Sequence, residues 1–96
     1  MSLVERLTDF EGAVGGAAAH APDGYPETSF RTYESNMADI RELWSEIKPR
    51  LRRDLGLARF VDEKLKEAFS AFEAGQKDIG QQAMWDIYNF GVKKLR

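Results

Sequence analysis

The sequence predicts an all-α fold, a small four-helix bundle-like domain that covers residues 1–96. Two observations lead to this prediction. Apolar residues recur every three or four positions in four separate segments, which is the spacing of one face of a helix. Glycine or proline residues lie between these segments, where helices stop. The length of 96 residues and the hydrophobic share of 43% are typical of one folded domain with a modest core.

The first helix is expected to be short, from about residue 3 to residue 14. A Ser-x-x-Glu capping-box pattern that begins at Ser2 marks its start. Gly15 and Gly16 mark its end, because glycine costs about 1 kcal/mol in a helix interior and readily takes the left-handed turn of a helix terminus. Residues 15–27 are therefore predicted to form a flexible loop.

The second helix carries the strongest pattern in the chain, and Thr28 or Ser29 is its expected cap. Its apolar residues alternate by three and four positions, a spacing that another helix alongside can cover. They are Phe30, Tyr33, Met37, Ile40, Trp44, Ile47 and Leu51. Pro49 lacks the N–H that a continuous helix needs, so we expect a kink there. Because Leu55 keeps the phase of the pattern, the prediction is one long, bent helix that ends at Gly56.

The third and fourth helices are predicted to form an antiparallel hairpin. The third helix runs from about residue 57 to residue 74, and Gly75 caps its end. Asp78 and Gln81 form a second capping-box pattern, which opens a helix toward the C-terminus. This last helix is apolar around most of its circumference, and such a helix is normally buried on more than one side. In a domain this small, we expect a second chain to supply part of the cover.

The expected contacts with that second chain are aromatic and apolar residues on the last two helices. Large aromatic side chains are typical anchors of protein interfaces. One candidate, Phe60, departs from the main apolar arc of its own helix. Tyr88 belongs to the main apolar face of the last helix, and Trp85 and Val92 flank that face. The candidate partner-binding residues are Trp85, Tyr88, Val92 and Phe60.

A short basic segment lies in an otherwise acidic or neutral chain of net charge −2. Residues 1–47 hold three basic and nine acidic residues, whereas residues 48–59 hold five basic residues and one acidic residue. The basic residues are Lys48, Arg50, Arg52, Arg53 and Arg59. They are consistent with a helix end stabilised by positive charge, with an acidic protein partner, or with an anion or nucleic acid. A sequence pI near 5.4 argues against a dedicated nucleic-acid module, which is usually strongly basic.

Few residues are suited to catalysis or to metal binding. His20 is the only histidine, and it falls in the predicted loop without a partner at helical spacing. With no cysteine, the chain has no thiolate nucleophile and no sulfur ligand. The carboxylates of the second helix lack the histidines that a di-iron bundle needs. We therefore expect no catalytic residues, no metal and no cofactor, although an enzyme site assembled at a dimer seam stays an alternative.

The preferred functional hypothesis is a non-enzymatic protein–protein interaction or regulatory module that forms a homodimer. The alternative is a nucleic-acid-binding regulator that uses the basic segment 48–59. No stretch of about 18 apolar residues is present, and the first residues do not form a secretion signal. We therefore expect a cytoplasmic protein that has no contact with a membrane.

Overall fold

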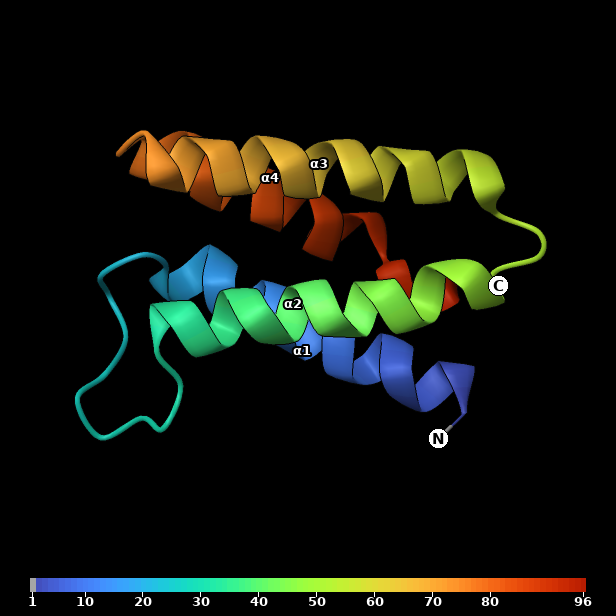
Figure 1. Ribbon diagram of the computed structural model, residues 1–96, viewed down its shortest axis with the longest axis horizontal. Helices are drawn as coiled ribbons and strands as arrows, with labels where there is room; N and C mark the ends of the chain where they lie inside the picture. The colour runs from blue at the N-terminus through green and yellow to red at the C-terminus, as the bar shows by residue number, and fades with distance from the viewer. Residues whose placement is uncertain (1) are drawn as a thin grey trace.

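The computed structural model describes residues 2–96, and this part of the chain is all-helical, without strands (Figure 1). The helices are α1 (Leu3–His20), α2 (Tyr33–Ile47), α3 (Leu55–Glu73) and α4 (Lys77–Phe90). Two short 3-10 helices follow α2 and α4, namely η1 (Lys48–Arg50) and η2 (Val92–Lys94). The predicted fold class, an all-α domain with four main helices, is confirmed.

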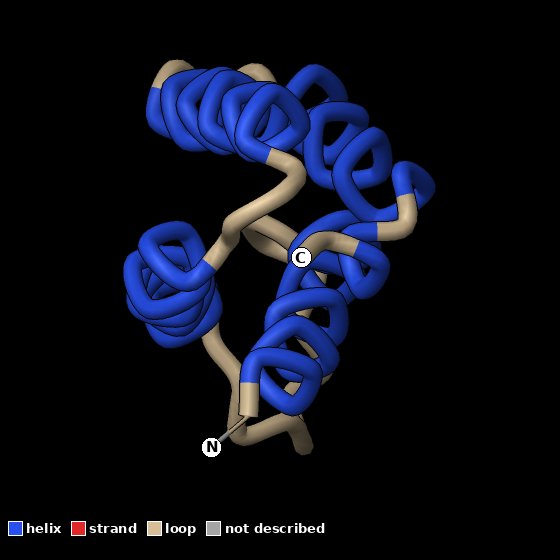
Figure 2. The backbone as a smooth tube through the Cα atoms, turned by 90° about the vertical axis from the view of Figure 1, so that its right-hand side faces the viewer, coloured by secondary structure: helices blue, strands red, loops and turns tan. Residues whose placement is uncertain are grey.

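The helices form two antiparallel pairs. Figure 1 shows α1 beside α2 in one layer and the α3–α4 hairpin in the other. Figure 2 shows the same two layers from the end, with the C-terminal residues between them. Helix α1 packs against both α2 and α4, so it joins the layers. The hairpin of the last two helices is therefore present as predicted.

The core is built from the apolar faces of all four helices and from the C-terminal segment. The rings of Phe10 and Trp44 stack with their centroids 5.3 Å apart, which joins α1 to α2. The rings of Tyr33 and Phe72 meet edge to face at 5.9 Å, which joins α2 to α3. The largest fully buried apolar side chains are Leu7, Phe10, Val14, Ile40, Ile47, Val61, Met84, Ile87, Val92 and Leu95.

The prediction that the first helix ends at Gly15 and Gly16 is wrong, because α1 continues to His20. Both glycines lie where the helix passes close to another part of the chain. A Cβ atom on Gly15 would lie 2.9 Å from Cε2 of Tyr88, and one on Gly16 would lie 2.5 Å from Nη1 of Arg31. Close packing therefore outweighs the low helix propensity of glycine. The connection to α2 is correspondingly shorter than predicted and covers residues 21–32.

The start of α2 also differs from the prediction. Thr32, and neither Thr28 nor Ser29, caps the helix: its hydroxyl accepts a hydrogen bond from the N–H of Ser35 at 3.1 Å, and the Ser35 hydroxyl accepts one from the N–H of Thr32 at 2.9 Å. This reciprocal pair is a capping box with serine in the place of the usual glutamate. Phe30 therefore precedes the helix, and its side chain is fully exposed.

The second and third helices are separate, so the prediction of one bent helix through Pro49 is wrong. Helix α2 ends at Ile47, the 3-10 turn η1 contains Pro49, and Leu51 is extended with φ −73° and ψ 138°. Leu51 is nevertheless buried, so its agreement with the helical phase reflects burial and not continued helix. Gly56 lies in the first turn of α3 and does not stop a helix.

Glycines end both helices of the hairpin. Gly75 has φ 75°, its N–H donates to the Phe72 carbonyl at 3.2 Å, and the N–H of Gln76 donates to the Ala71 carbonyl at 2.8 Å. This is a Schellman motif, and it confirms the predicted cap of the third helix. Helix α4 begins at Lys77 without a side-chain cap, so the predicted capping box at Asp78 is absent.

Helix α4 is shorter than predicted because Gly91, at φ 81°, ends it after Phe90. The left-handed conformation of Gly91 turns the chain back toward the core. Val92 in η2 and Leu95 beyond it are buried there. The residues after Gly91 thus form a separate short segment that packs at the end of the bundle.

A buried polar cluster fixes the connection between α1 and α2. The side chain of Asn36 is fully buried, and its Nδ2 donates to the carbonyl of Ala13 at 3.0 Å. The Tyr25 hydroxyl donates to Oδ1 of Asn36 at 2.6 Å. Burial raises the pKa of Tyr25 to about 12, against the opposing effect of the Arg31 charge. The neutral phenol is therefore the form that this cluster favours.

We predict that Gly80→Ala lowers the free energy of unfolding by about 1–3 kcal/mol, the usual cost of overpacking. A Cβ atom on Gly80 would lie 2.5 Å from Cε1 of Phe72, whose buried ring is already packed against Tyr33. The matched control is Gly12→Ala, which meets nothing within 4 Å and should raise stability by about 0.4–1 kcal/mol. Urea unfolding followed by circular dichroism measures both. Equal effects of the two substitutions would contradict the packing argument.

We predict that stability falls as the pH rises from about 10 to about 12 through ionisation of Tyr25. The pKa of Tyr25 is about 12 in the folded state, against about 10 for an unperturbed tyrosine. A raised pKa means that the contribution to stability is complete below about pH 10 and is lost as the pH passes the folded value. The measurement is the free energy of unfolding of wild type minus that of Tyr25→Phe across this range. A difference that does not change with pH would refute the prediction.

Candidate functional site

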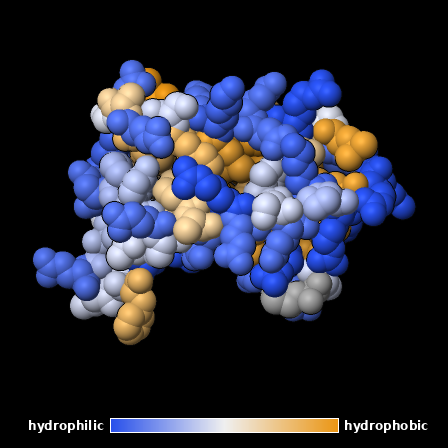
Figure 3. Space-filling model, viewed as in Figure 1, coloured by the Kyte–Doolittle hydropathy of each residue, from blue (hydrophilic) through white to orange (hydrophobic). Residues whose placement is uncertain are grey.

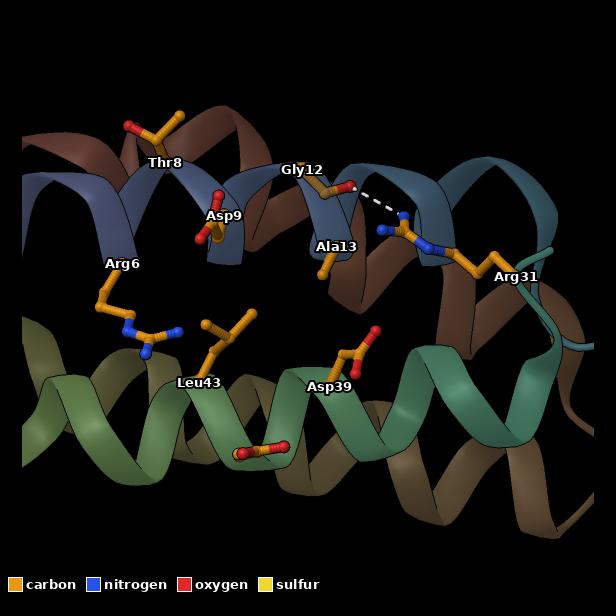
Figure 4. Close-up of a pocket in the computed structure, with 9 residues that line it drawn as sticks. Arg6, Thr8, Asp9, Gly12, Ala13, Arg31, Asp39 and Leu43 are labelled. Carbon is orange, nitrogen blue, oxygen red and sulfur yellow. Dashed lines mark hydrogen bonds between the residues drawn. The ribbon is translucent and has the colours of Figure 1, made fainter. Parts of the chain in front are cut away.

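A charged cleft lies between α1 and α2 (Figure 4). Its volume is about 440 Å³. Figure 4 shows Arg6 directed from α1 toward α2, Asp39 directed back from α2, and Thr8 directed away from α2. The residues that line it are Arg6, Thr8, Asp9, Gly12, Ala13, Arg31, Asp39, Glu42 and Leu43.

The charges of this cleft serve to hold the two helices together. Nε of Arg6 lies 3.0 Å from Oε2 of Glu46, which is an ion pair between α1 and α2. Nη1 of Arg31 donates to the Gly12 carbonyl at 3.5 Å. Neither histidine nor cysteine lines the cleft, and the described residues contain no group of three or more His, Cys, Asp or Glu that could hold a metal ion. Thr8 carries the one hydroxyl group among the side chains that line the cleft, and this hydroxyl donates to the Val4 carbonyl within α1 at 2.9 Å.

An exposed aromatic pair lies on the outer side of α4, next to α1. Trp85 and Tyr88 are each 38% exposed, and their rings meet edge to face with centroids 5.5 Å apart. Tyr88 lies against Gly15, where the missing side chain leaves room for its ring. Gly12 and Ala19, one turn to either side of Gly15, are exposed small residues of α1. We call the surface made by Gly12, Gly15, Ala19, Trp85 and Tyr88 the aromatic face.

The other two predicted partner-binding residues do not belong to the aromatic face. Val92 is fully buried in the core, because the turn at Gly91 directs the chain inward. Phe60 of α3 is partly buried, and its ring lies 5.1 Å from that of Phe90. Phe90 and Tyr88 are two positions apart, which puts them on roughly opposite sides of a helix. The structure thus brings Trp85 and Tyr88 together and separates them from Val92 and Phe60.

The side chains of Lys48 and Arg52, both in the predicted basic segment, contact other groups of the fold. Nζ of Lys48 lies 2.6 Å from Oδ2 of Asp62. Nη1 of Arg52 donates to the carbonyls of Pro49 at 2.7 Å and Leu51 at 3.2 Å. These contacts stabilise the turn between α2 and α3.

Arg53 and Arg59 are both exposed, and neither forms an ion pair with another described residue. Arg50 lies in η1, and its side chain is likewise exposed. The segment therefore presents basic groups to solvent at one end of the molecule.

Arg96 also lies against this segment. No pattern in the sequence indicated this contact. The main-chain oxygen of Arg96 accepts hydrogen bonds from the N–H groups of Arg52 at 3.1 Å, Arg53 at 2.8 Å and Asp54 at 3.1 Å. The N–H of Arg96 donates in return to Oδ2 of Asp54 at 2.9 Å. Arg96 thus lies beside residues 52–54. We call this region, with residues 48–53 and Arg59, the basic end.

A groove opens at the basic end between η1 and the first half of α3. Its volume is about 450 Å³. Apolar groups of Pro49, Leu55 and Ala58 line it, together with the charged residues Lys48, Arg59 and Asp62. Figure 3 shows hydrophobic side chains over the first turns of α3, at the right of the view. We call this feature the junction groove.

Asp62 fixes one wall of the junction groove to α2. Oδ1 of Asp62 accepts a hydrogen bond from Nε1 of Trp44 at 2.7 Å, and Oδ2 pairs with Lys48. Burial alone would raise the pKa of the Asp62 carboxyl. The hydrogen bonds from Lys48 and Trp44 and the charge of Lys48 together hold the pKa below its ordinary value.

The comparisons with known proteins found no match, either among protein-family models or among curated proteins and solved structures. Among the described residues, no helix combines the length and the apolar character needed to cross a bilayer.

We predict that Asp62→Asn lowers the free energy of unfolding at neutral pH by about 1–3 kcal/mol, since it removes hydrogen bonds to a charged group. Because the pKa of Asp62 is lowered, its contribution is present above about pH 4 and is lost as the pH falls through the folded value. The wild type should therefore lose more stability than the variant on acidification below about pH 4. Urea unfolding over this range tests the prediction, and parallel pH profiles for the two proteins would contradict it.

Proposed function

We propose that this chain is a non-enzymatic protein-interaction module that self-associates as a homodimer through the aromatic face. The observation that carries the proposal is the exposed pair of Trp85 and Tyr88, held edge to face on a rigid helix. Aromatic side chains that are already ordered lose little conformational entropy on binding. Such residues are also the usual centres of binding energy in protein interfaces.

The composition of the aromatic face suits a second copy of the same chain. None of its five residues is charged, and Glu11, one turn before Gly15, is paired with Lys93 at 3.6 Å. Gly12 and Ala19 have little or no side chain, which lets two helices approach closely, whereas the space beside Gly15 is already filled by Tyr88 of the same chain. In a two-fold dimer, the aromatic pair of each copy packs on the small residues of the other. One chain of 96 residues builds only a modest hydrophobic core, which also favours a partner that adds to this core.

The proposed setting is the cytoplasm, without a membrane partner. A chain with no cysteine needs no oxidising compartment to fold. Thr8, whose hydroxyl is the one such group among the residues that line the cleft, is directed away from α2, which supports binding rather than catalysis.

Analytical ultracentrifugation of the full chain tests the proposal. We predict that the wild type dimerises at high micromolar concentration and that Trp85→Ala weakens the dimer by about tenfold or more, equivalent to about 1.4 kcal/mol. Ala19→Glu should weaken it as well, because the dimer would bury a charge from each copy. Both positions are exposed, so the monomer should keep its fold and its helical circular dichroism.

Ile79→Ala is the matched control. Ile79 is an exposed apolar residue of α4. It lies about three turns before Phe90 and so shares the side of α4 from which Phe90 contacts Phe60 of α3. Its substitution should leave the dimer unchanged. A compact wild-type monomer at high micromolar concentration, or equal loss of the dimer in Ile79→Ala and Trp85→Ala, would refute this assignment.

A further inference from the structure

We infer that the junction groove binds an acidic peptide segment that carries one hydrophobic side chain. This is a second binding site, at the opposite side of the bundle from α1 and the aromatic face, and it does not depend on dimerisation. The hydrophobic side chain enters the groove, and the acidic residues on either side of it contact the basic end.

The walls of the groove fit a single apolar side chain. Pro49, Leu55 and Ala58 contribute apolar surface, and Leu55 is 61% exposed in the free protein. The volume of about 450 Å³ lies within the roughly 300–1,000 Å³ range of ligand pockets. Covering this surface gives a hydrophobic contribution that no contact within the chain supplies.

The rim of the groove selects for negative charge. The basic end combines the five basic residues of segment 48–59 with Arg96. Two acidic residues of this region have partners within the fold, Asp62 in Lys48 and Trp44 and Asp54 in the N–H of Arg96, while Glu63, one turn after Arg59, is exposed. The region therefore carries excess positive charge, which attracts an acidic partner and fixes its orientation.

The site is ordered before any partner arrives. The contacts of Asp62 hold α3 against the end of α2, so the distance between the two walls is set. The three N–H groups that bond the main-chain oxygen of Arg96 hold residues 52–54 in place. Arg52 is held by the carbonyls of Pro49 and Leu51. Because these groups are ordered already, binding costs less conformational entropy.

A peptide suits the site better than nucleic acid. Phosphate groups make no favourable contact with an apolar groove. The guanidinium of Arg52 already donates hydrogen bonds to main-chain carbonyls. The basic end is also short, whereas residues 1–47 carry three basic and nine acidic residues. A duplex that extends past the basic end meets this acidic part, while a short acidic segment does not.

Fluorescence polarisation with the full chain tests the inference. The probe is a labelled short peptide of Glu and Asp with one central Phe. Two matched peptides replace the Phe by Ser or replace every acidic residue by its amide. We expect the acidic Phe peptide to bind. Each matched peptide should bind at least about tenfold more weakly, a difference of about 1.4 kcal/mol or more. Equal binding of the acidic Phe and Ser peptides would overturn the role of the groove.

Protein variants locate the contact. Arg59→Glu and Leu55→Ser should each weaken binding of the acidic Phe peptide by about tenfold or more. Both residues are exposed, so the fold should persist, which circular dichroism checks. Lys77→Glu is the control: it makes the same charge change at the N-terminus of α4, the opposite end of the molecule, where it also removes the exposed ion pair of Lys77 with Asp23. It should leave binding unchanged. Equal loss in Lys77→Glu and Arg59→Glu would show nonspecific charge attraction and overturn the site.

Two further outcomes identify a different occupant and also overturn the inference. A labelled DNA duplex that binds more tightly than the acidic Phe peptide, with loss in Arg59→Glu, would assign the basic end to nucleic acid. An absence of peptide binding, with a change of sedimentation in Arg59→Glu, would assign the groove to a second copy of the chain.

Discussion

The rest of the structure depends on the buried amide of Asn36. Its Nδ2 must have an acceptor and its Oδ1 a donor, because an unpaired buried polar group costs about 1–3 kcal/mol. The carbonyl of Ala13 and the hydroxyl of Tyr25 meet these needs. One side chain therefore sets the register of α1 against α2 and closes the connection of residues 21–32. This register places Trp44 where it stacks on Phe10 and still reaches Asp62.

The two layers are joined differently along the molecule, and this keeps the two proposed surfaces apart. Helices α1 and α4 approach closely, since Gly15 leaves space for the Tyr88 ring. Helices α2 and α3 are bridged mainly by long side chains. The Tyr33 ring contacts that of Phe72, and Cζ of the Arg41 guanidinium lies 4.2 Å from the centre of the Phe69 ring. The close seam carries the aromatic face on its outer side, and the bridged seam ends at the junction groove. A change at one surface should therefore have little effect on the other.

The sequence was sufficient for the fold class, for the stripe of α2 from Tyr33 to Ile47 and for the turn at Gly75, because each follows from local rules. The prediction from the sequence was wrong where a contact with a residue far along the chain determines the local structure. Gly15 and Gly16 looked like a helix end, and only the contacts with Tyr88 and Arg31 explain why the helix continues. Trp85 was recognisable as an aromatic residue beside the main apolar face of its helix, and Tyr88 as one on that face. The burial of Val92 follows from the turn at Gly91. No local pattern links Arg96 to Arg52, so the full extent of the basic end could not be predicted.

The two tryptophans of this chain occupy contrasting environments, which gives the molecule its own pair of optical reporters. Trp44 is almost fully buried, stacks on Phe10 and donates a hydrogen bond to the Asp62 carboxylate, whereas Trp85 is 38% exposed. A soluble quencher such as iodide reaches the second indole and not the first. Emission from Trp44 therefore follows the integrity of the core and the wall of the junction groove. Emission from Trp85 follows whatever covers the aromatic face, so one unlabelled sample can separate unfolding from association.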